Sequence, residues 1–566
     1  MTEPPAPRRP GRTARTDSLT GRVAAAARVT LVAAASTLLA GCTVIPVPAS
    51  SGTASGAVTS TSSSTSSTTP AGSSQPGHPS SLAPSPLSSE SASTAESAST
   101  AEPLAAASAA ATLTEFLDFP DLTPLLVPSP DPEVLGPLLA EALTVQDGSV
   151  SAAVRDGLTG ELLYDQGADT AVVPASAVKV LTAVAALEVL GPDHRYTTAA
   201  VGVPAGPEGT AVVLDAGGDV MLGTGANAEE ANGRAGLGTL ALKTAEALQA
   251  QGTTGTVSVH LDDSGYEGPT ASPDWSSDIV SSGNASAVQP MATYGGRAVP
   301  SRDTDRLHDP ALYAAEVFRD QLAAHAQTLG LDITLAAKTS REPVLPAPTA
   351  PTPAESSSSP ASSPSSSLSA SPSSSAEPEP TGTELASVQS APLAEQMAYM
   401  LQTSDNQVAE ATGRNLALAA GAPGSFAGAA QTIEQTLAEL EVDTTGMALV
   451  DASGLSGQNL VSAAQLTAAL QVATTAPDLA AAATGLPVAG EQGTLEQRMA
   501  GTDAAGNVQA KTGTLSSVAS LTGTVQTEDG RTLLFSFVAN NQPGVLTNAR
   551  FAVDRGAVVL AGCGCR

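Results

Sequence analysis

The chain is short of the residues that build disulfide frameworks and metal sites. Only three cysteines occur in 566 residues, and aromatic residues make up 2%. Two of the cysteines, Cys563 and Cys565, lie in the terminal Cys-Gly-Cys-Arg, a spacing that does not fit a zinc ribbon. A disulfide, two free thiols or an intermolecular bridge all remain open for this pair. So few cysteines suit an exported protein that is stabilised by its core.

Histidine is equally scarce. The five histidines show no H-E-x-x-H spacing, and none accompanies a G-x-S-x-G turn. A zinc hydrolase and a Ser-His-Asp hydrolase are therefore disfavoured. No metal ion and no cofactor is predicted.

Basic residues are few, and lysine is nearly absent. The chain carries 24 Lys and Arg against 55 Asp and Glu, for a net charge of -31, and only four of the cations are lysines. A protein this acidic is not expected to bind nucleic acid through its net field. Against this background, two lysines stand out because each lies in a short motif.

The first motif is Ser176-Ala-Val-Lys179, at the start of an apolar stretch. Pro174 ahead of it and Gly191 after it predict a helix between them. Residues three apart share a helix face, so Lys179 is expected to reach the Ser176 hydroxyl. Serine needs an adjacent base to become a nucleophile, and a lysine serves as one when burial lowers its pKa.

The second motif, Ser404-Asp405-Asn406, lies between two helical stretches, 393–401 and 408–416. On such a connection the Ser404 hydroxyl could relay a proton to a leaving amine. The Asn406 amide could hold a backbone carbonyl of a substrate.

The third motif, Lys511-Thr512-Gly513, is expected to open a strand that runs through 515–525 and pairs with 531–538. Lys511 and Thr512 offer a cation and a hydroxyl to a carboxylate. Gly513 would let an acyl donor lie against the strand edge.

In this order, S-x-x-K, S-x-N and K-T-G resemble the penicillin-interacting serine acyltransferases. Ser176 and Ser404 are 228 residues apart, a separation similar to that in the low-molecular-mass penicillin-binding proteins of the D-alanyl-D-alanine carboxypeptidase/endopeptidase family, which carry a domain inserted between the first two motifs. The resemblance covers about 140 to 560 and includes five further segments: 150–164, 214–222, 393–410, 451–456 and 486–498. Val220 and Ala452 depart from the family's usual Pro and Gly.

The resemblance implies an α/β fold of the penicillin-binding and serine β-lactamase-like kind, an antiparallel sheet plus a helical lobe, with an inserted α+β domain. It implies cleavage of peptidoglycan stem peptides through an acyl-enzyme on Ser176, with β-lactam antibiotics as inhibitors. The backbone N–H groups of Ser176 and Thr514 would form the oxyanion hole. Two alternatives stay open: a β-lactamase, and a wall-binding scaffold lipoprotein with weak or no catalysis.

The N-terminus reads as an export signal. Residues 1–41 combine a basic start with a short apolar run, and Leu39-Ala-Gly-Cys42 matches a bacterial lipobox. Cys42 is therefore predicted to carry a lipid that anchors the protein to the membrane, outside the cytoplasm and facing the cell wall. Residues 42–112 are Ser-, Thr- and Pro-rich, as in a disordered tether.

The remaining chain is predicted to divide into four parts. A first peptidase segment covers 113–200, the inserted domain 201–341, a low-complexity loop 342–385, and the second peptidase segment 386–566. Within the insertion, helices are expected at 237–249 and 310–329.

Overall fold

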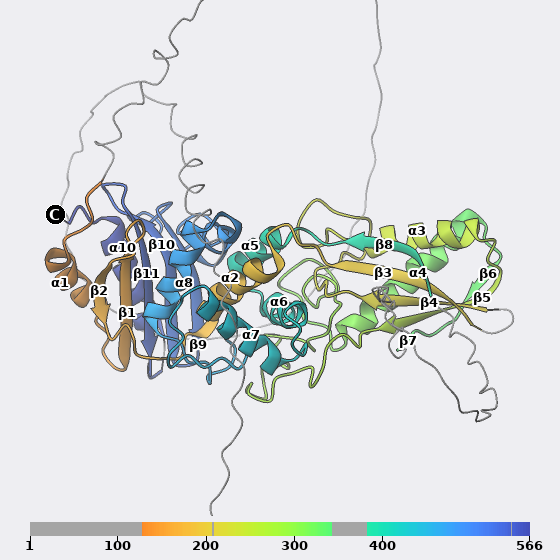
Figure 1. The fold of residues 1–566 in the computed structure, drawn as a ribbon, viewed down its shortest axis with the longest axis horizontal. Helices are drawn as coiled ribbons and strands as arrows, with labels where there is room; N and C mark the ends of the chain where they lie inside the picture. Colours follow the sequence, from red (N-terminus) through yellow and green to blue (C-terminus); the bar gives the residue numbers. More distant parts are fainter. Residues whose placement is uncertain (1–126, 206–208, 342–381, 545, 566) are drawn as a thin grey trace, which may run out of the picture. The chain divides into compact units, whose positions relative to one another are not determined.

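The computed structural model describes residues 127–205, 209–341, 382–544 and 546–565. These residues form two β-sheets with helices packed against them (Figure 1). The predicted signal sequence, Cys42, the tether and most of the low-complexity loop lie outside the described residues. No helix within the described ranges is long and apolar enough to cross a membrane.

The first sheet has five antiparallel strands in the order β2-β1-β11-β10-β9. Chain ends that are far apart in sequence meet here, because β1 pairs directly with β11. Its strands are β1 (Ser149–Asp156), β2 (Leu162–Gln166), β9 (Val508–Leu515), β10 (Val518–Gln526) and β11 (Thr532–Asn540).

Alternate side chains of β11 fill two different cores, as the twofold period of a strand requires. Phe535 and Phe537 face one side, where they pack with the helices α1 (Pro132–Ala142) and α10 (Thr547–Ala561). Leu534 and Val538 face the helical lobe on the other side. Both faces of this sheet are therefore covered.

The helical lobe surrounds α2 (Val178–Leu190), whose residues 178–187 are all buried. A helix that is buried and largely apolar all round belongs in the centre of a core. Around it lie α5 (Leu393–Thr403), α6 (Asn406–Ala419), α7 (Phe426–Glu439), α8 (Ala463–Thr475) and α9 (Ala481–Thr484). Gly191 ends α2 with a φ of 87°, which suits glycine.

The second sheet is mixed, in the order β6-β5-β4-β3-β8, with β7 paired to β5. Two helices, α3 (Leu237–Ala250) and α4 (Pro310–Leu329), pack with it around a separate core. Its strands are β3 (Thr197–Pro204), β4 (Gly209–Ala216), β5 (Gly255–Asp262), β6 (Ile333–Leu335), β7 (Ser340–Arg341) and β8 (Thr383–Gln389).

Both helices predicted for the insertion are present at the expected positions, and the predicted fold class is confirmed. However, β3 crosses the boundary expected between 200 and 201, and β8 crosses the one expected between 385 and 386. The two strands cross these boundaries because they pair with each other from either side of the insertion. The strand expected at 515–525 and its pairing with 531–538 are confirmed as β10 and β11, but the expected start of the strand is wrong. A turn after Leu515 separates β9 from β10, and the third motif lies within β9.

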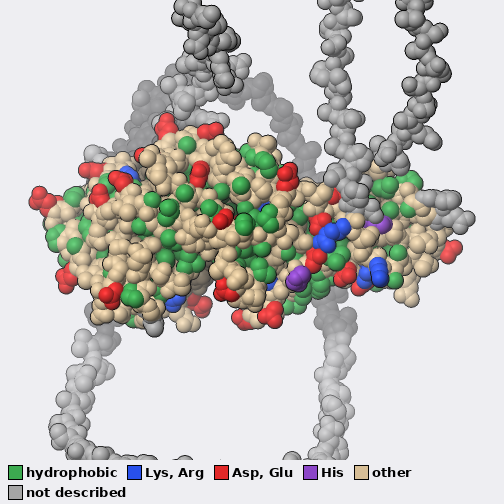
Figure 2. Space-filling model, turned by 90° about the horizontal axis from the view of Figure 1, so that it is seen from below, with side chains coloured by type: hydrophobic (Ala, Val, Ile, Leu, Met, Phe, Trp, Pro, Cys, Tyr) green, Lys and Arg blue, Asp and Glu red, His purple; other side chains and the backbone are tan. Residues whose placement is uncertain are grey.

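The surface reflects the composition. On the face seen in Figure 2, acidic side chains are spread widely and basic ones are few.

The two terminal cysteines, Cys563 and Cys565, are joined by a disulfide. Within the described ranges, no group of three or more His, Cys, Asp or Glu side chains is arranged to hold a metal ion.

Candidate active site

Ser176 lies in a short 3₁₀ helix, Ala175–Ala177, that leads directly into α2. Ala175 has a φ of 50°, a left-handed conformation that costs a residue with a Cβ about 1–2 kcal/mol. The surroundings hold this turn in place: the Ser520 hydroxyl of β10 donates to the Pro174 carbonyl at 2.8 Å. Strained backbone of this kind clusters at functional sites, and here it precedes the predicted nucleophile.

Lys179 is completely buried one turn after Ser176. Its Nζ lies 3.1 Å from the Ser176 Oγ, as the i, i+3 spacing predicts. It also donates to the Asn406 Oδ1 at 2.7 Å and to the Ser453 carbonyl at 2.6 Å. Asn406 is oriented by its own Nδ2, which donates to the Asn284 carbonyl at 2.8 Å.

These three contacts can be made by a charged lysine, through its three N–H donors, and also by a neutral one. An uncharged lysine has two N–H donors and one lone pair, and the Asn406 and Ser453 oxygens can only accept. When they take both donors, the lone pair is left for the Ser176 hydroxyl. Lys179 then has the geometry of a general base for that proton.

Burial favours the neutral amine. Desolvation lowers the pKa of Lys179 to about 8, although the carboxylates of Glu410, Asp451 and Asp405 act in the opposite sense. Glu410 is itself fully buried, and desolvation, with the nearby charge of Asp451, raises its pKa to about 8. Each group therefore becomes neutral more readily than it would in water, Lys179 by losing a proton and Glu410 by gaining one.

The second motif forms the turn between α5 and α6. Ser404 adopts a left-handed conformation with a φ of 56°, and Asp405 caps α6 by accepting from the N–H groups of Gln407 and Val408. The predicted inter-helix position is therefore confirmed. The Ser404 hydroxyl makes no hydrogen bond to any described residue, so the proton relay to a leaving amine stays a prediction.

Asp405 is held by two arginines from the segment after β5. Its carboxylate lies 3.3 Å from Arg297 and 3.2 Å from Arg306, with all three side chains at least nine-tenths buried. Burial alone would raise the pKa of Asp405, but the two cations hold it below its usual value. The ion pairs fix the turn that presents Asn406 to Lys179.

The third motif is in the edge strand β9, next to the nucleophile turn. Lys511 is fully buried and donates to the Thr512 carbonyl at 2.7 Å, while the Thr512 hydroxyl donates to the Thr494 Oγ1 at 3.0 Å. Desolvation, together with the positive charges of Lys179 and Arg498, lowers the pKa of Lys511 well below its usual value. A carboxylate arriving beside it would favour its charged form.

Gly513 allows β9 to approach the nucleophile turn. A Cβ at this position would lie 2.1 Å from the Ser520 Oγ and 2.9 Å from the Pro174 carbonyl oxygen. No side chain fits there. The glycine thus serves a close backbone approach in the free protein, in addition to the contact with an acyl donor expected from the sequence.

Thr514 is exposed at the end of this strand. On the free edge of β9, the Ala510 N–H donates to the Pro487 carbonyl at 2.9 Å. Because N–H groups of alternate residues share one edge of a strand, the Thr514 N–H faces the same edge, away from β10. This direction suits the oxyanion role predicted for it with the Ser176 N–H.

Several contacts that complete the site were not predicted from the sequence. The Ser453 carbonyl, Glu410, Arg297 and Arg306 carry no motif of their own, so no local signal marks them. Asp451, in the segment 451–456, supports the loop that carries Ser453: it accepts from the Gly454 and Ser456 N–H groups and from the Asn459 amide, and also from the Trp275 indole at 2.9 Å.

With this geometry established, the comparisons with known proteins identify the family. The sequence profile of the D-Ala-D-Ala carboxypeptidase 3 (S13) family matches residues 138–306 and 371–558. The chain belongs to this family. The prediction of a serine-type D-Ala-D-Ala carboxypeptidase/endopeptidase, a hydrolase acting on peptidoglycan, is thereby confirmed.

Individual relatives agree with the family assignment. Carboxypeptidase DacB of Mycolicibacterium smegmatis is 34% identical over 451 residues, which cover 78% of this chain and 86% of that protein. The D-alanyl-D-alanine carboxypeptidase of Actinomadura sp. is 30% identical over 438 residues, 70% of this chain and 79% of that one. Penicillin-binding protein 4 of Haemophilus influenzae has the same fold, with a TM-score of 0.54 at 18% identity over 74% of this chain and 98% of that one.

Proposed function

We propose that Ser176 is the nucleophile and Lys179 its general base. The observation that carries the proposal is the set of three contacts at the Lys179 Nζ, which in the neutral amine leave the lone pair for the Ser176 hydroxyl. As the Ser176 Oγ attacks the carbonyl carbon between two D-alanines, its proton passes to Lys179. The N–H groups of Ser176 and Thr514 stabilise the oxyanion that forms.

The leaving D-alanine amine then needs a proton. Lys179 holds the one taken from Ser176, and the unpartnered Ser404 hydroxyl is placed on the adjoining turn to pass it on. Departure of the amine leaves an ester on Ser176, and water hydrolyses this ester to release the shortened stem peptide. The substrate's terminal carboxylate is assigned to Lys511 and Thr512, and its backbone carbonyl to the Asn406 amide.

β-Lactams are expected to acylate Ser176 by the same steps. Penicillin-binding protein 4 of Haemophilus influenzae has been solved in complex with a β-lactam. In this chain, a penicillin would present its ring carbonyl to Ser176 and its carboxylate to Lys511. Opening of the ring would leave a slowly hydrolysed ester on Ser176.

Replacing Ser176 with alanine is expected to abolish covalent labelling by a fluorescent penicillin and release of D-alanine from a pentapeptide stem, because no other group is placed to form the ester. Mass spectrometry of the labelled protein and of the muropeptide products measures both. Ser301→Ala, at an exposed serine, is the matched control and should label normally. Undiminished labelling of Ser176→Ala would refute the assignment.

We also propose that Cys42 carries a diacylglycerol anchor, supported by the lipobox at 39–42. Two acyl chains suffice for stable membrane attachment, whereas an acidic protein gains nothing from electrostatic binding to an anionic surface. Cys42→Ala expressed in a Gram-positive bacterium should lose label from radioactive palmitate and move to the soluble fraction. Retention of both label and membrane association would contradict the anchor.

A further inference from the structure

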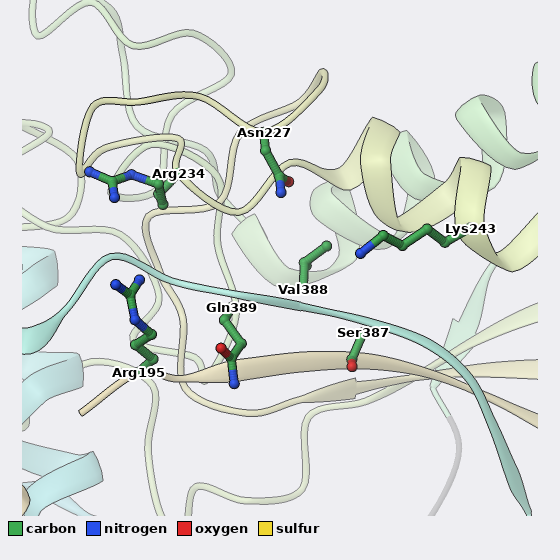
Figure 3. Close-up of a pocket in the computed structure, with 7 residues that line it drawn as sticks. All are labelled: Arg195, Asn227, Arg234, Lys243, Ser387, Val388 and Gln389. Carbon is green, nitrogen blue, oxygen red and sulfur yellow. The ribbon is translucent and has the colours of Figure 1, made fainter. Parts of the chain in front are cut away.

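A surface pocket lined by three cations lies away from the nucleophile. The cavity measures about 420 Å³, and Figure 3 shows the side chains that border it. Arg195 follows the end of α2, Arg234 lies on the loop before α3, and Lys243 extends from α3 towards the centre. The pocket thus gathers three of the chain's 24 basic residues although the net charge is -31.

Two of these cations have no acidic partner among the described residues. Arg234 pairs with Glu395 at 2.6 Å. Arg195 bonds only to the Ser390 carbonyl, at 2.7 Å, through one of its five N–H groups. Lys243 makes no hydrogen bond or ion pair within the described ranges. These two unpaired cations border the same cavity in a chain that carries 55 acidic residues.

A neutral side chain of the pocket, Asn227, also presents a donor. The Asn227 Oδ1 already accepts from the Gly236 N–H at 2.8 Å, so its Nδ2 is left to donate, and Figure 3 shows this side chain pointing into the cavity. On β8, Figure 3 shows Val388 on the same side as Asn227 and Lys243, whereas Ser387 and Gln389 point to the other face of the strand. A site rich in donors selects an anion.

We infer that this pocket binds a phosphate group, either as free phosphate or as a phosphate ester of a polyol chain. Its donors come from three directions: the Arg195 side, the Asn227 loop and the Lys243 helix. A tetrahedral phosphate directs three strong acceptor oxygens to different sides of such a cavity, whereas the two oxygens of a carboxylate lie in one plane. The inference is independent of the proposed catalytic roles.

The test is isothermal titration of the full-length chain with sodium phosphate and with glycerol phosphate at constant ionic strength. Lys243→Gln removes an exposed cation that has no structural partner, and it should weaken phosphate binding about tenfold through the loss of one charge-assisted hydrogen bond. Lys338→Gln, at an exposed lysine outside the pocket, is the matched control and should bind as the wild type does. Tighter binding of glycerol phosphate than of phosphate would point to the ester as the natural source.

Two results would overturn the inference. One is equal phosphate affinity in Lys243→Gln and Lys338→Gln. The other is sodium acetate binding as tightly as phosphate at matched ionic strength, which would remove the preference for a tetrahedral anion. Penicillin labelling of each variant reports on Ser176 separately and should stay at the wild-type level, so a failure of the catalytic proposal would be visible independently.

Discussion

Replacing Lys179 with methionine is expected to slow acylation of Ser176 by penicillin about 10²–10⁴-fold, the usual contribution of a general base. Methionine keeps an unbranched chain in the buried position but has no lone pair that could take the Ser176 proton. The rate constant for acylation, measured by stopped-flow or gel fluorescence, is the relevant quantity. Lys338→Met, at an exposed lysine, should acylate at the wild-type rate.

Lys179→Met should also change how the rate of acylation depends on pH. Only neutral Lys179 can accept a proton, and the fraction that is neutral grows as the pH rises towards its pKa of about 8. Wild-type acylation should therefore rise about tenfold per pH unit below this value and level off above it. The acylation rate of Lys179→Met should not rise with pH in this range. If the rise persisted in the mutant, another group would have to be the base.

The methionine variant also leaves two buried acceptors, the Asn406 Oδ1 and the Ser453 carbonyl, without their donor. Each unpaired group costs about 1–3 kcal/mol, so thermal unfolding of the variant must be measured alongside its kinetics. A folded variant that acylates at the wild-type rate would contradict the base assignment.

Replacing Asp405 with asparagine is expected to lower the free energy of unfolding by about 3–5 kcal/mol. The carboxylate is 2% exposed and faces both Arg297 and Arg306, so its loss leaves two buried cations without a counter-charge. The turn carrying Asn406 should loosen and acylation should slow. Urea denaturation measures the loss of stability directly.

A surface ion pair provides the control for Asp405. Asp320 pairs with Arg319, but its side chain is 71% exposed, and Asp320→Asn should cost less than about 1 kcal/mol. Equal losses of stability from the two substitutions would show that burial of the Asp405 cluster, which is Asp405 with Arg297 and Arg306, does not increase its contribution to stability.

The Asp405 cluster also predicts a stability profile in acid. The pKa of this carboxyl is lower in the folded protein than in the unfolded chain, so its stabilisation is present above the unfolded pKa. That stabilisation is lost as the pH falls through the folded pKa, below a pH of about 4. Asp405→Asn should weaken the acid dependence of unfolding.

The local parts of the site were predictable from the sequence because they depend on short-range geometry. A helix places residues three apart on one face, and this rule alone brought Lys179 to Ser176. Pro174 and Gly191 marked the limits of that helix. The position of Lys511 within its strand was mispredicted, since the turn after Leu515 carries no glycine or proline signal.

The remaining contacts depended on how distant segments pair. Asn406 reaches Lys179 across 227 residues because α2 and α6 pack against each other in the helical lobe, and β3 and β8 pair on either side of the insertion. The sequence by itself determined the chemistry of this protein, a serine with a lysine beside it in a chain with almost no other lysine. Only the tertiary structure supplied the Ser453 carbonyl and the arginines around Asp405, because backbone acceptors and long-range ion pairs leave no periodic pattern.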